Sequence, residues 1–195
     1  MKFLFQKENA VAANAKTVLI FLNMQKVQRK LKMKYYNEIS RSYNELHGDE
    51  QIKKAEIIKK EILKKKSSGL LLDIGGGTGV STEVFLDNFN CTVIDPSEKL
   101  LVQGNNNMKK IVASAEKLPF DAEKFDVIIS ITSLHHVEIK KALAEIKRVA
   151  KPDALVAVSF LKKSKKLEIF RKEFKKIYKK SREIEESRDI IFLSF

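Results

Sequence analysis

The chain has 195 residues, and its 38 Lys and Arg against 25 Asp and Glu give a formal net charge of +13. This length allows one domain with a sizeable core, while the single cysteine, Cys91, excludes an internal disulfide framework and favours the reducing cytoplasm. The charge is uneven, because residues 1–33 carry +6, residues 67–160 carry −2 and residues 161–195 carry +6. Basic flanks around a near-neutral core favour a polyanionic partner such as RNA, although solvated lysine-rich helices would give the same pattern.

Residues 1–33 form a basic N-terminal extension whose role the sequence leaves open. Its mildly apolar stretch, residues 11–24, is shorter and more polar than the about 20 apolar residues that span a bilayer. Glu8 and the absence of an early apolar run argue against a signal peptide. An amphipathic helix, a disordered arm or an upstream start codon before Met33 would each explain this segment. We expect the functional domain to span residues 34–195.

Two helices are predicted ahead of the most informative stretch. Residues 35–46 and 51–66 both place apolar side chains at spacings of three and four, and the second also carries lysines on its opposite face. Gly48 is expected to end the first helix, and Asp49 is expected to cap the second.

Residues 70–82, LLLDIGGGTGVST, are the central feature of the sequence. The apolar run 70–74 is typical of a strand buried on both faces, and a helix is predicted from Ser81 to about Asn88. Glycines between a strand and a helix start let the backbone approach a ligand, while the helix start offers free N–H groups. The stretch therefore predicts a nucleotide-binding turn. Its pattern is D-x-G-x-G-x-G, with Val80 where the dinucleotide fingerprint needs its third glycine.

With Asp73 at the strand end, this motif resembles the first motif of the class I S-adenosylmethionine (SAM)-dependent methyltransferases. An acid here suits a ligand with a positive group rather than a pyrophosphate. The resemblance covers residues 34–195. It implies an α/β fold with a doubly wound, Rossmann-like sheet of seven strands, mostly parallel and ending in an antiparallel hairpin. It also implies SAM as the cofactor and methyl transfer as the reaction.

A second buried strand, residues 91–94, ends at Asp95, which lies 20 residues after Gly75. An acid at this position can accept hydrogen bonds from both ribose hydroxyls of a nucleotide. The sequence D-P-S-E is also a good helix start, so an ordinary cap would explain the same residues. Together with the glycine turn, the pattern favours SAM over NAD.

Residues 111–120, IVASAEKLPF, combine a third short strand with a loop that should line the ligand crevice. The segment resembles the family's D-A-E-x-L-P-F box, in which the acid before the alanine meets the adenine amino group. This chain has Ser114 at that position, which is a weaker, neutral acceptor. The departure weakens the hydrogen bond that the resemblance implies to the adenine amino group.

A fourth buried strand, residues 125–131, leads into SITSLHHV at the strand end where the family places its methyl-acceptor pocket. The string resembles small-molecule methyltransferases and also the enzymes that methylate a carboxymethyl group on tRNA wobble uridine. The absence of N-P-P-Y or D-P-P-Y disfavours the adenine- and glutamine-amide N-methyltransferases. His135 and His136 could orient the acceptor or take its proton, or they could be structural histidines.

The C-terminal third completes the pattern of the family. The segment AEIKRVAKP resembles the family's L-x-E-I-x-R-V-L-K-P-G-G, with Asp153 and Ala154 in place of the two glycines. The predicted elements are a helix over 137–150, a strand over 154–160, a helix over 164–178 and a hairpin of strands over 180–186 and 190–195.

The resemblance also supplies the candidate site residues. The cofactor-binding candidates are Asp73, Gly75, Gly76, Gly77, Gly79, Asp95, Pro96, Ser114, Ala115, Glu116, Ser130 and Tyr43, the last from a Y-Y-x-x-I-x-x-x-Y segment that folds over the cofactor in the family. The catalytic candidates are His135 and His136, and no metal cluster and no transmembrane segment are predicted.

Three hypotheses for the function follow. The first is a methyltransferase acting on RNA, with tRNA as the favoured RNA, through the basic flanks. The second is a methyltransferase acting on a small metabolite. The third is a non-catalytic SAM-binding or adapter subunit, for which Ser114 and the N-terminal extension leave room. The sequence does not indicate an oligomeric state.

Overall fold

The computed structural model describes residues 23–24, 27 and 43–194, and the chain divides into two units, Met1–Glu38 and Ile39–Phe195. The three described residues of the first unit are helical and exposed. The interpretations of residues 1–33, and the expected start of the domain at residue 34, therefore lie outside the described residues.

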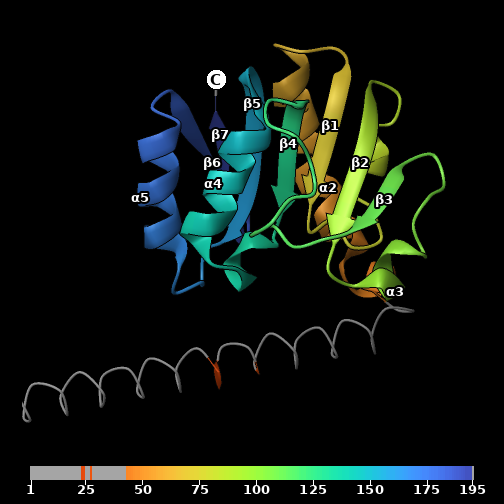
Figure 1. Cartoon of the computed structure of the whole chain (residues 1–195), viewed down its shortest axis with the longest axis horizontal. Helices are drawn as coiled ribbons and strands as arrows, with labels where there is room; N and C mark the ends of the chain where they lie inside the picture. The colour runs from red at the N-terminus through yellow and green to blue at the C-terminus, as the bar shows by residue number, and fades with distance from the viewer. Residues whose placement is uncertain (1–22, 25–26, 28–42, 195) are drawn as a thin grey trace, which may run out of the picture. The chain divides into compact units, whose positions relative to one another are not determined.

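The second unit is built on a seven-stranded sheet with the strand order β3-β2-β1-β4-β5-β7-β6 (Figure 1). The strands β1 to β5 run parallel, whereas β7 is antiparallel to both β5 and β6. This confirms the predicted mixed sheet with a C-terminal hairpin. The strands are β1 (Gly69–Ile74), β2 (Phe89–Asp95), β3 (Lys109–Val112), β4 (Phe125–Ile131), β5 (Ala150–Leu161), β6 (Ser181–Glu185) and β7 (Asp189–Ser194).

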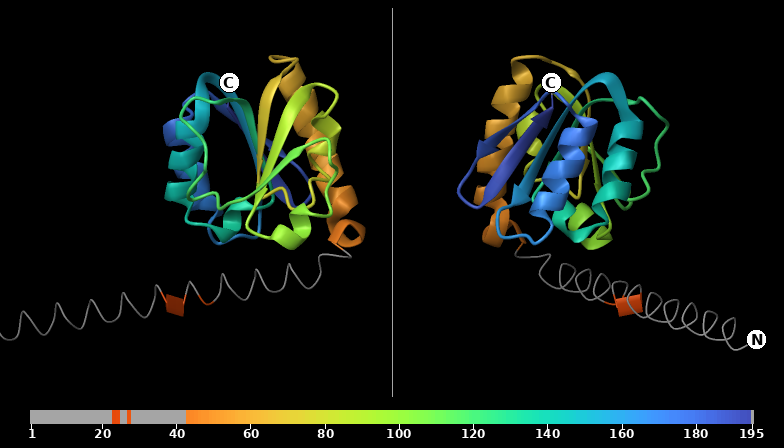
Figure 2. Two further views of the ribbon diagram at one scale, coloured as in Figure 1. Left: turned by 45° about the vertical axis from the view of Figure 1, so that its right-hand side comes forward. Right: turned by 90° about the vertical axis from the view of Figure 1, so that its left-hand side faces the viewer.

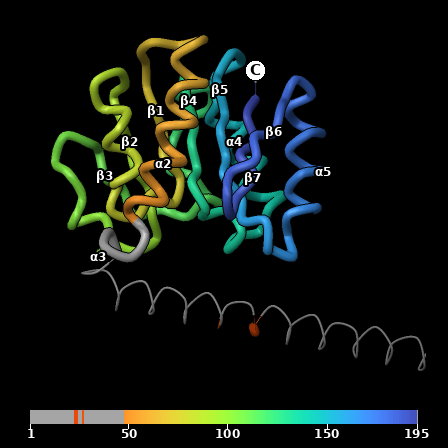
Figure 3. Tube along the Cα trace, turned by 180° about the vertical axis from the view of Figure 1, so that it is seen from behind, coloured from red at the N-terminus to blue at the C-terminus, as the bar shows by residue number. Residues whose placement is uncertain are grey.

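Helices cover both faces of the sheet and enclose two hydrophobic cores (Figure 2). On one face lie α4 (Ile139–Val149) and α5 (Leu167–Ile177), and on the other lie α2 (Tyr43–Leu63), η2 (Glu83–Phe85) and α3 (Glu98–Leu101). Seen from behind, α2 runs across the sheet in Figure 3. The short turn η3 (Leu134–His136) connects β4 to α4.

A cluster of fully buried phenylalanines fixes α5 on the sheet. The Phe160 ring of β5 stacks on Phe170 of α5 with centroids 4.5 Å apart, and Phe192 of β7 meets Phe170 edge-on at 5.0 Å. Such aromatic pairs contribute about 0.5–1.5 kcal/mol beyond the area they bury. The cluster therefore sets where the loop between β5 and α5 begins.

The predicted break at Gly48 is wrong, because α2 continues through it from Tyr43 to Leu63. Gly48 is buried, and the helix beyond it packs Ala55, Ile58 and Ile62 against the sheet. A glycine inside a helix costs only about 1 kcal/mol relative to alanine, which packing of this kind outweighs.

The predicted helix from Ser81 to Asn88 is also wrong, because only the three-residue 3-10 turn η2 forms there. The hydroxyl groups of Ser81 and Thr82 bond to the Asp73 carboxylate inside the fold. These polar side chains point inward, whereas an amphipathic helix would direct them to solvent. The site therefore has no extended helix behind its glycine loop.

Candidate cofactor and acceptor site

The parallel strands bring the predicted site segments to one edge of the sheet. In the sheet, β2 pairs with one side of β1 and β4 pairs with the other side. The strand order therefore reverses between β1 and β4, which makes this the topological switch point. Ligands of doubly wound sheets bind outside the carboxyl ends of the strands at such a point. The glycine turn, Asp95, the loop after β3 and the loop after β4 all leave from this edge, at the bottom of Figure 1.

The glycine loop, residues 75–79, has a conformation that only glycine adopts easily. Gly75, Gly77 and Gly79 have φ values of +73°, +58° and +79°. A Cβ atom added to Gly75 would lie 2.5 Å from Ser133 Oγ, so a side chain there would also collide with the turn after β4. The loop is thus closely packed against the turn after β4.

The backbone N–H groups of this loop already have acceptors inside the protein. Gly75 and Gly76 donate to the Ile94 carbonyl at 2.8 and 3.2 Å, Gly77 donates to Asp95 Oδ2 at 3.1 Å, and Gly79 donates to the Gly76 carbonyl at 2.8 Å. The free N–H groups were expected at the helix start after these glycines, where Thr82 N and Glu83 N both donate to the Gly79 carbonyl, at 2.9 and 3.0 Å. A pyrophosphate needs such donors, so the loop geometry disfavours a dinucleotide.

Asp73 supports the loop from within. Its side chain has no exposed surface, and Oδ2 accepts hydrogen bonds from Thr82 Oγ1 at 2.6 Å and Ser81 Oγ at 3.4 Å. Burial raises the pKa of this carboxyl to about 7, while the two hydroxyls act in the opposite direction. Oδ1 is buried without a hydrogen-bond partner among the described residues, which leaves an acceptor for a donor that the protein does not supply.

Asp95 joins the end of β2 to the glycine loop. Its Oδ2 accepts from Gly77 N at 3.1 Å and its Oδ1 from Ser97 N at 2.8 Å, and burial raises its pKa against these two bonds. The N-cap of α3 is Ser97, whose Oγ accepts from Leu100 N, so Asp95 is not needed as the cap. Each carboxylate oxygen keeps a lone pair for a further donor. Pro96 lies exposed between Asp95 and Ser97.

The Ser114 side chain takes part in a local turn after β3. Its Oγ accepts from Glu116 N at 3.3 Å and donates to Glu116 Oε2 at 3.1 Å. Glu116 Oε1 in turn accepts from Glu138 N at the start of α4. Ala115 between them is buried. The three sequence candidates of this loop are therefore close together at the predicted edge.

Glu145 and Arg148 of α4, which were not among the site candidates, hold this same loop in place. Arg148 donates to the carbonyls of Phe120 and Leu118 at 2.7 and 3.0 Å. Glu145 accepts from Leu118 N at 2.8 Å and from Arg148 Nε at 2.7 Å, and the hydrogen bond from Arg148 lowers its pKa. The E-I-x-R-V pattern was the available signal, because its acid and base lie three residues apart on one helix.

The turn after β4 touches the glycine loop. Ser130 and Ser133 both donate to the Ile74 carbonyl at 2.8 Å, and their oxygens are 2.7 Å apart. Thr132 between them has φ = +53°, a left-handed conformation that is unusual for a β-branched residue. Thr132 and Ser133 were missed because positive φ at threonine has no sequence signal.

The two histidines lie in η3, directly after this turn. Their ring centroids are 3.7 Å apart, and the His135 ring meets Phe160 edge-on at 6.2 Å. Both side chains are half-buried at the edge where the sequence placed the acceptor. Tyr43 is the first residue of α2, but its side chain lies outside the described residues.

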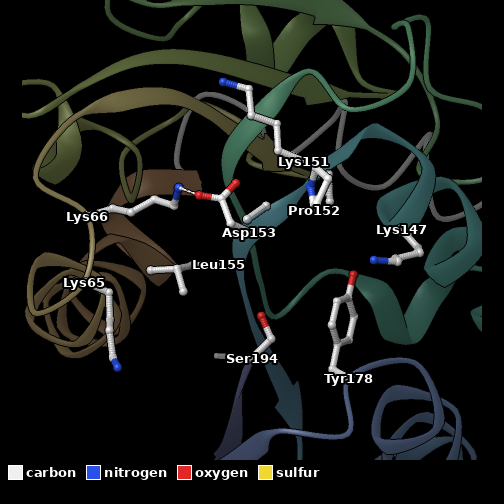
Figure 4. Close-up of a pocket in the computed structure, with 11 residues that line it drawn as sticks. Lys65, Lys66, Lys147, Lys151, Pro152, Asp153, Leu155, Tyr178 and Ser194 are labelled. Carbon is white, nitrogen blue, oxygen red and sulfur yellow. Dashed lines mark hydrogen bonds and ion pairs between the residues drawn. The ribbon is translucent and has the colours of Figure 1, made fainter.

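A cavity of about 390 Å³ lies at the opposite edge of the sheet (Figure 4). Four lysines from the C-terminal ends of α2 and α4 and the start of β5 line it, where they offset the negative ends of the helix dipoles. Lys66 pairs there with Asp153 at 2.6 Å, and the Tyr178 hydroxyl points toward Lys147 in Figure 4. The cavity contains none of the predicted site residues.

Within residues 23–24, 27 and 43–194, no three His, Cys, Asp or Glu side chains are grouped so that they could hold a metal ion. Over the same residues, no helix has the length and apolar character needed to cross a membrane.

Residues 72–158 match the family model described as a methyltransferase domain. An uncharacterized protein of Methanocaldococcus jannaschii is 36% identical over 124 residues, which are 62% of this chain and 48% of that protein. The ubiquinone/menaquinone biosynthesis C-methyltransferase of Stutzerimonas stutzeri is 36% identical over 112 residues, which are 50% of this chain and 44% of that one. The chain spans about half the length of the curated relatives it matches.

Solved structures agree in fold. A candidate SAM-dependent methyltransferase of Methanococcus maripaludis aligns with a TM-score of 0.60 at 16% identity, over 83% of this chain and 90% of that one. A complex between the Haloferax volcanii Trm112 methyltransferase activator and a candidate methyltransferase aligns at 0.61 and 15%, over 77% of each chain. SAM is the cofactor of this family. Residues 72–158 therefore belong to the methyltransferase domain family, and the chain has the class I SAM-dependent methyltransferase fold.

Proposed function

We propose that this chain transfers a methyl group from SAM to an RNA acceptor, with tRNA as the preferred RNA. The observation that carries the proposal is the glycine loop at the switch point, tied to Asp95 by the 3.1 Å bond from Gly77 N. This pair of motifs joins an approachable backbone to a carboxylate at the edge where ligands of this fold bind.

Each cofactor candidate has a role in this proposal. Asp95 accepts from the ribose hydroxyls with its remaining lone pairs, and Asp73 Oδ1, which has no partner among the described residues, would accept from the cationic end of SAM once Asp73 is ionised, above its raised pKa of about 7. Ser114, Ala115 and Glu116 lie beside the adenine. The remaining candidates are Gly75, Gly76, Gly77, Gly79, Pro96, Ser130 and Tyr43, which would shape the cofactor surface.

When bound, SAM supplies a methyl group that its sulfonium makes electrophilic. The chain then has to align a nucleophile with the bond that breaks and to exclude water. His135 and His136, directly after β4, would orient the acceptor or take its proton. A carboxylate acceptor would need no base, so the role of the histidines depends on the acceptor.

A basic loop at the same edge favours RNA as the acceptor. This lysine loop, residues 162–166 (KKSKK), follows β5, which ends beside Asp189 at the carboxyl edge of the sheet. Lys163 and Lys165 are exposed and have no ion-pair or hydrogen-bond partner among the described residues. Free cations beside the transfer site suit phosphate groups. The buried Phe160–Phe170 stack joins the strand before this loop to the helix after it.

A small-molecule acceptor is the second candidate. It is supported by the relative from Stutzerimonas stutzeri, whose printed name is a C-methyltransferase of ubiquinone/menaquinone biosynthesis. A SAM-binding subunit that needs a partner for turnover is the third candidate. The structure paired with the Trm112 activator supports it, as does Ser114 in place of an acid. We keep a cytoplasmic location as part of the proposal.

Transfer of tritiated methyl from SAM into a whole-cell extract tests the proposal, with and without ribonuclease pretreatment. We expect tritium to be incorporated in the untreated extract and to be lost after ribonuclease pretreatment. Counts in the small-molecule fraction would refute the RNA acceptor and leave methyl transfer intact. SAM binding without any counts would support the subunit that needs a partner.

A further inference from the structure

A fully buried ion pair lies behind the candidate site. Lys54 of α2 and Asp189 at the start of β7 both have no exposed surface, and Lys54 Nζ is 3.2 Å from Asp189 Oδ2. Lys54 also contacts Glu50 Oε1 at 2.6 Å. Burying two charges costs free energy that apolar residues of similar size would not cost, so stability alone is a weak explanation for the pair.

The pair is bonded to the turn after β4. Asp189 Oδ2 accepts from Thr132 Oγ1 at 2.7 Å and from Ser159 Oγ at 2.9 Å, and Lys54 Nζ donates to Thr132 Oγ1 at 2.9 Å. Thr132 N donates to Ser159 Oγ at 2.8 Å. Both the backbone and the side chain of Thr132 are therefore held by one network whose residues come from α2, β5 and β7.

The residue held in this way is the one with an unfavourable backbone. Thr132 has φ = +53°, which an L side chain with a branched Cβ avoids unless its surroundings impose it. The next residue, Ser133, donates to the Ile74 carbonyl and would collide with any side chain at Gly75. The network thus reaches the first glycine of the cofactor loop through one turn.

We propose that the Lys54–Asp189 pair positions the glycine loop for SAM by holding Thr132 in its left-handed conformation. The inference rests on the proposed function, because it concerns the affinity of the same cofactor site. Lys54 is a positioning residue, since it acts through Thr132 and Ser133. If the pair only joined α2 to β7, the effect of removing it on SAM affinity would not depend on the residue at position 132.

The test removes both charges together, so that neither is left buried alone. We expect Lys54→Met/Asp189→Asn to weaken SAM binding about tenfold, measured by calorimetric titration, because the turn can then relax to an ordinary conformation. Adding Thr132→Gly should restore the affinity to within about threefold, because glycine adopts positive φ without strain. Thr132→Ala is the matched control, since it removes the same hydroxyl without easing positive φ and should restore nothing.

A second ion pair, away from the site, serves as a control: its removal takes away one positive and one negative charge but does not change the position of the turn after β4. Lys66→Met/Asp153→Asn removes an ion pair of 2.6 Å at the opposite edge of the sheet and should leave SAM affinity unchanged. If the buried double variant fails to fold, Ser159→Ala keeps both charges and removes the bonds of Ser159 Oγ to Thr132 N and Asp189 Oδ2, while Thr132 N still donates to the Ser159 carbonyl at 3.1 Å. It should weaken SAM binding about threefold, with the same rescue by Thr132→Gly.

Three results would count against the inference. Equal SAM affinity in the wild type and the charge-free variant would overturn it while leaving the proposed function intact. Equal behaviour of the glycine and alanine variants would also overturn it and leave the pair a structural link. A folded wild type that does not bind SAM would overturn the proposed function and this inference with it.

Discussion

Replacing Asp73 by asparagine should raise the stability of the fold at neutral pH. Asp73 has no exposed surface, and burial raises its pKa from 3.8 to about 7. The asparagine carbonyl can still accept from Thr82 Oγ1, which lies 2.6 Å from Asp73 Oδ2. The substitution is nearly isosteric, so its main effect is to remove a charge that burial disfavours.

The size and the sign follow from the raised pKa. Between pH 4 and 7 the folded chain keeps a proton on Asp73 that the unfolded chain has released. The free energy of unfolding of the wild type therefore falls as the pH rises through this window. A pKa raised from 3.8 to about 7 corresponds to roughly 4 kcal/mol of lost stability above pH 7.

Urea unfolding at pH 5 and pH 8 measures the effect. We expect Asp73→Asn to gain up to roughly 4 kcal/mol over the wild type at pH 8 and much less at pH 5. Asp126→Asn is a control of opposite sign, because Lys151 and Leu70 N hold the pKa of Asp126 below its ordinary value. An Asp73→Asn gain that does not grow with pH would refute the reasoning.

Two further substitutions test the cofactor loop and the lysine loop. Gly77→Val should abolish SAM binding in a calorimetric titration, since Gly77 has φ = +58° and a side chain would occupy the approach to the cofactor; wild-type affinity would mean that the site is misplaced. Lys163→Glu/Lys165→Glu should lower the salt dependence of tRNA binding by about one unit of slope per lysine, whereas Lys176→Glu/Lys179→Glu, exposed residues with the same change in charge, should lower it less. Equal slopes for the two pairs would remove the lysine loop from the proposed RNA surface.

The sheet was predictable because its signals are local. Each buried strand reads as a short apolar run bounded by turn residues, whereas the arrangement of seven strands was implied by the resemblance to the methyltransferase family. The end of β2 at Asp95 and the C-terminal hairpin were placed correctly for this reason. The errors at Gly48 and at Ser81–Asn88 arose where tertiary contacts outweighed local propensity.

The support of the site could not be predicted in the same way. Lys54 and Asp189 lie 135 residues apart in the sequence and read individually as surface charges. The sequence around Thr132 does not predict its positive φ, because the network that imposes this conformation comes from α2, β5 and β7. The motifs thus predict which residues bind the cofactor, but they do not predict which residues hold that site in place.

The central claim is that the glycine loop and Asp95 form a SAM site, and one titration tests it most directly. Wild type and Asp95→Ala are titrated calorimetrically with SAM and, separately, with NAD. We predict that the wild type binds SAM and not NAD, and that Asp95→Ala loses about 1–3 kcal/mol of binding free energy with its charge-assisted hydrogen bonds. Binding of NAD, or equal SAM affinity in the two proteins, would contradict the account.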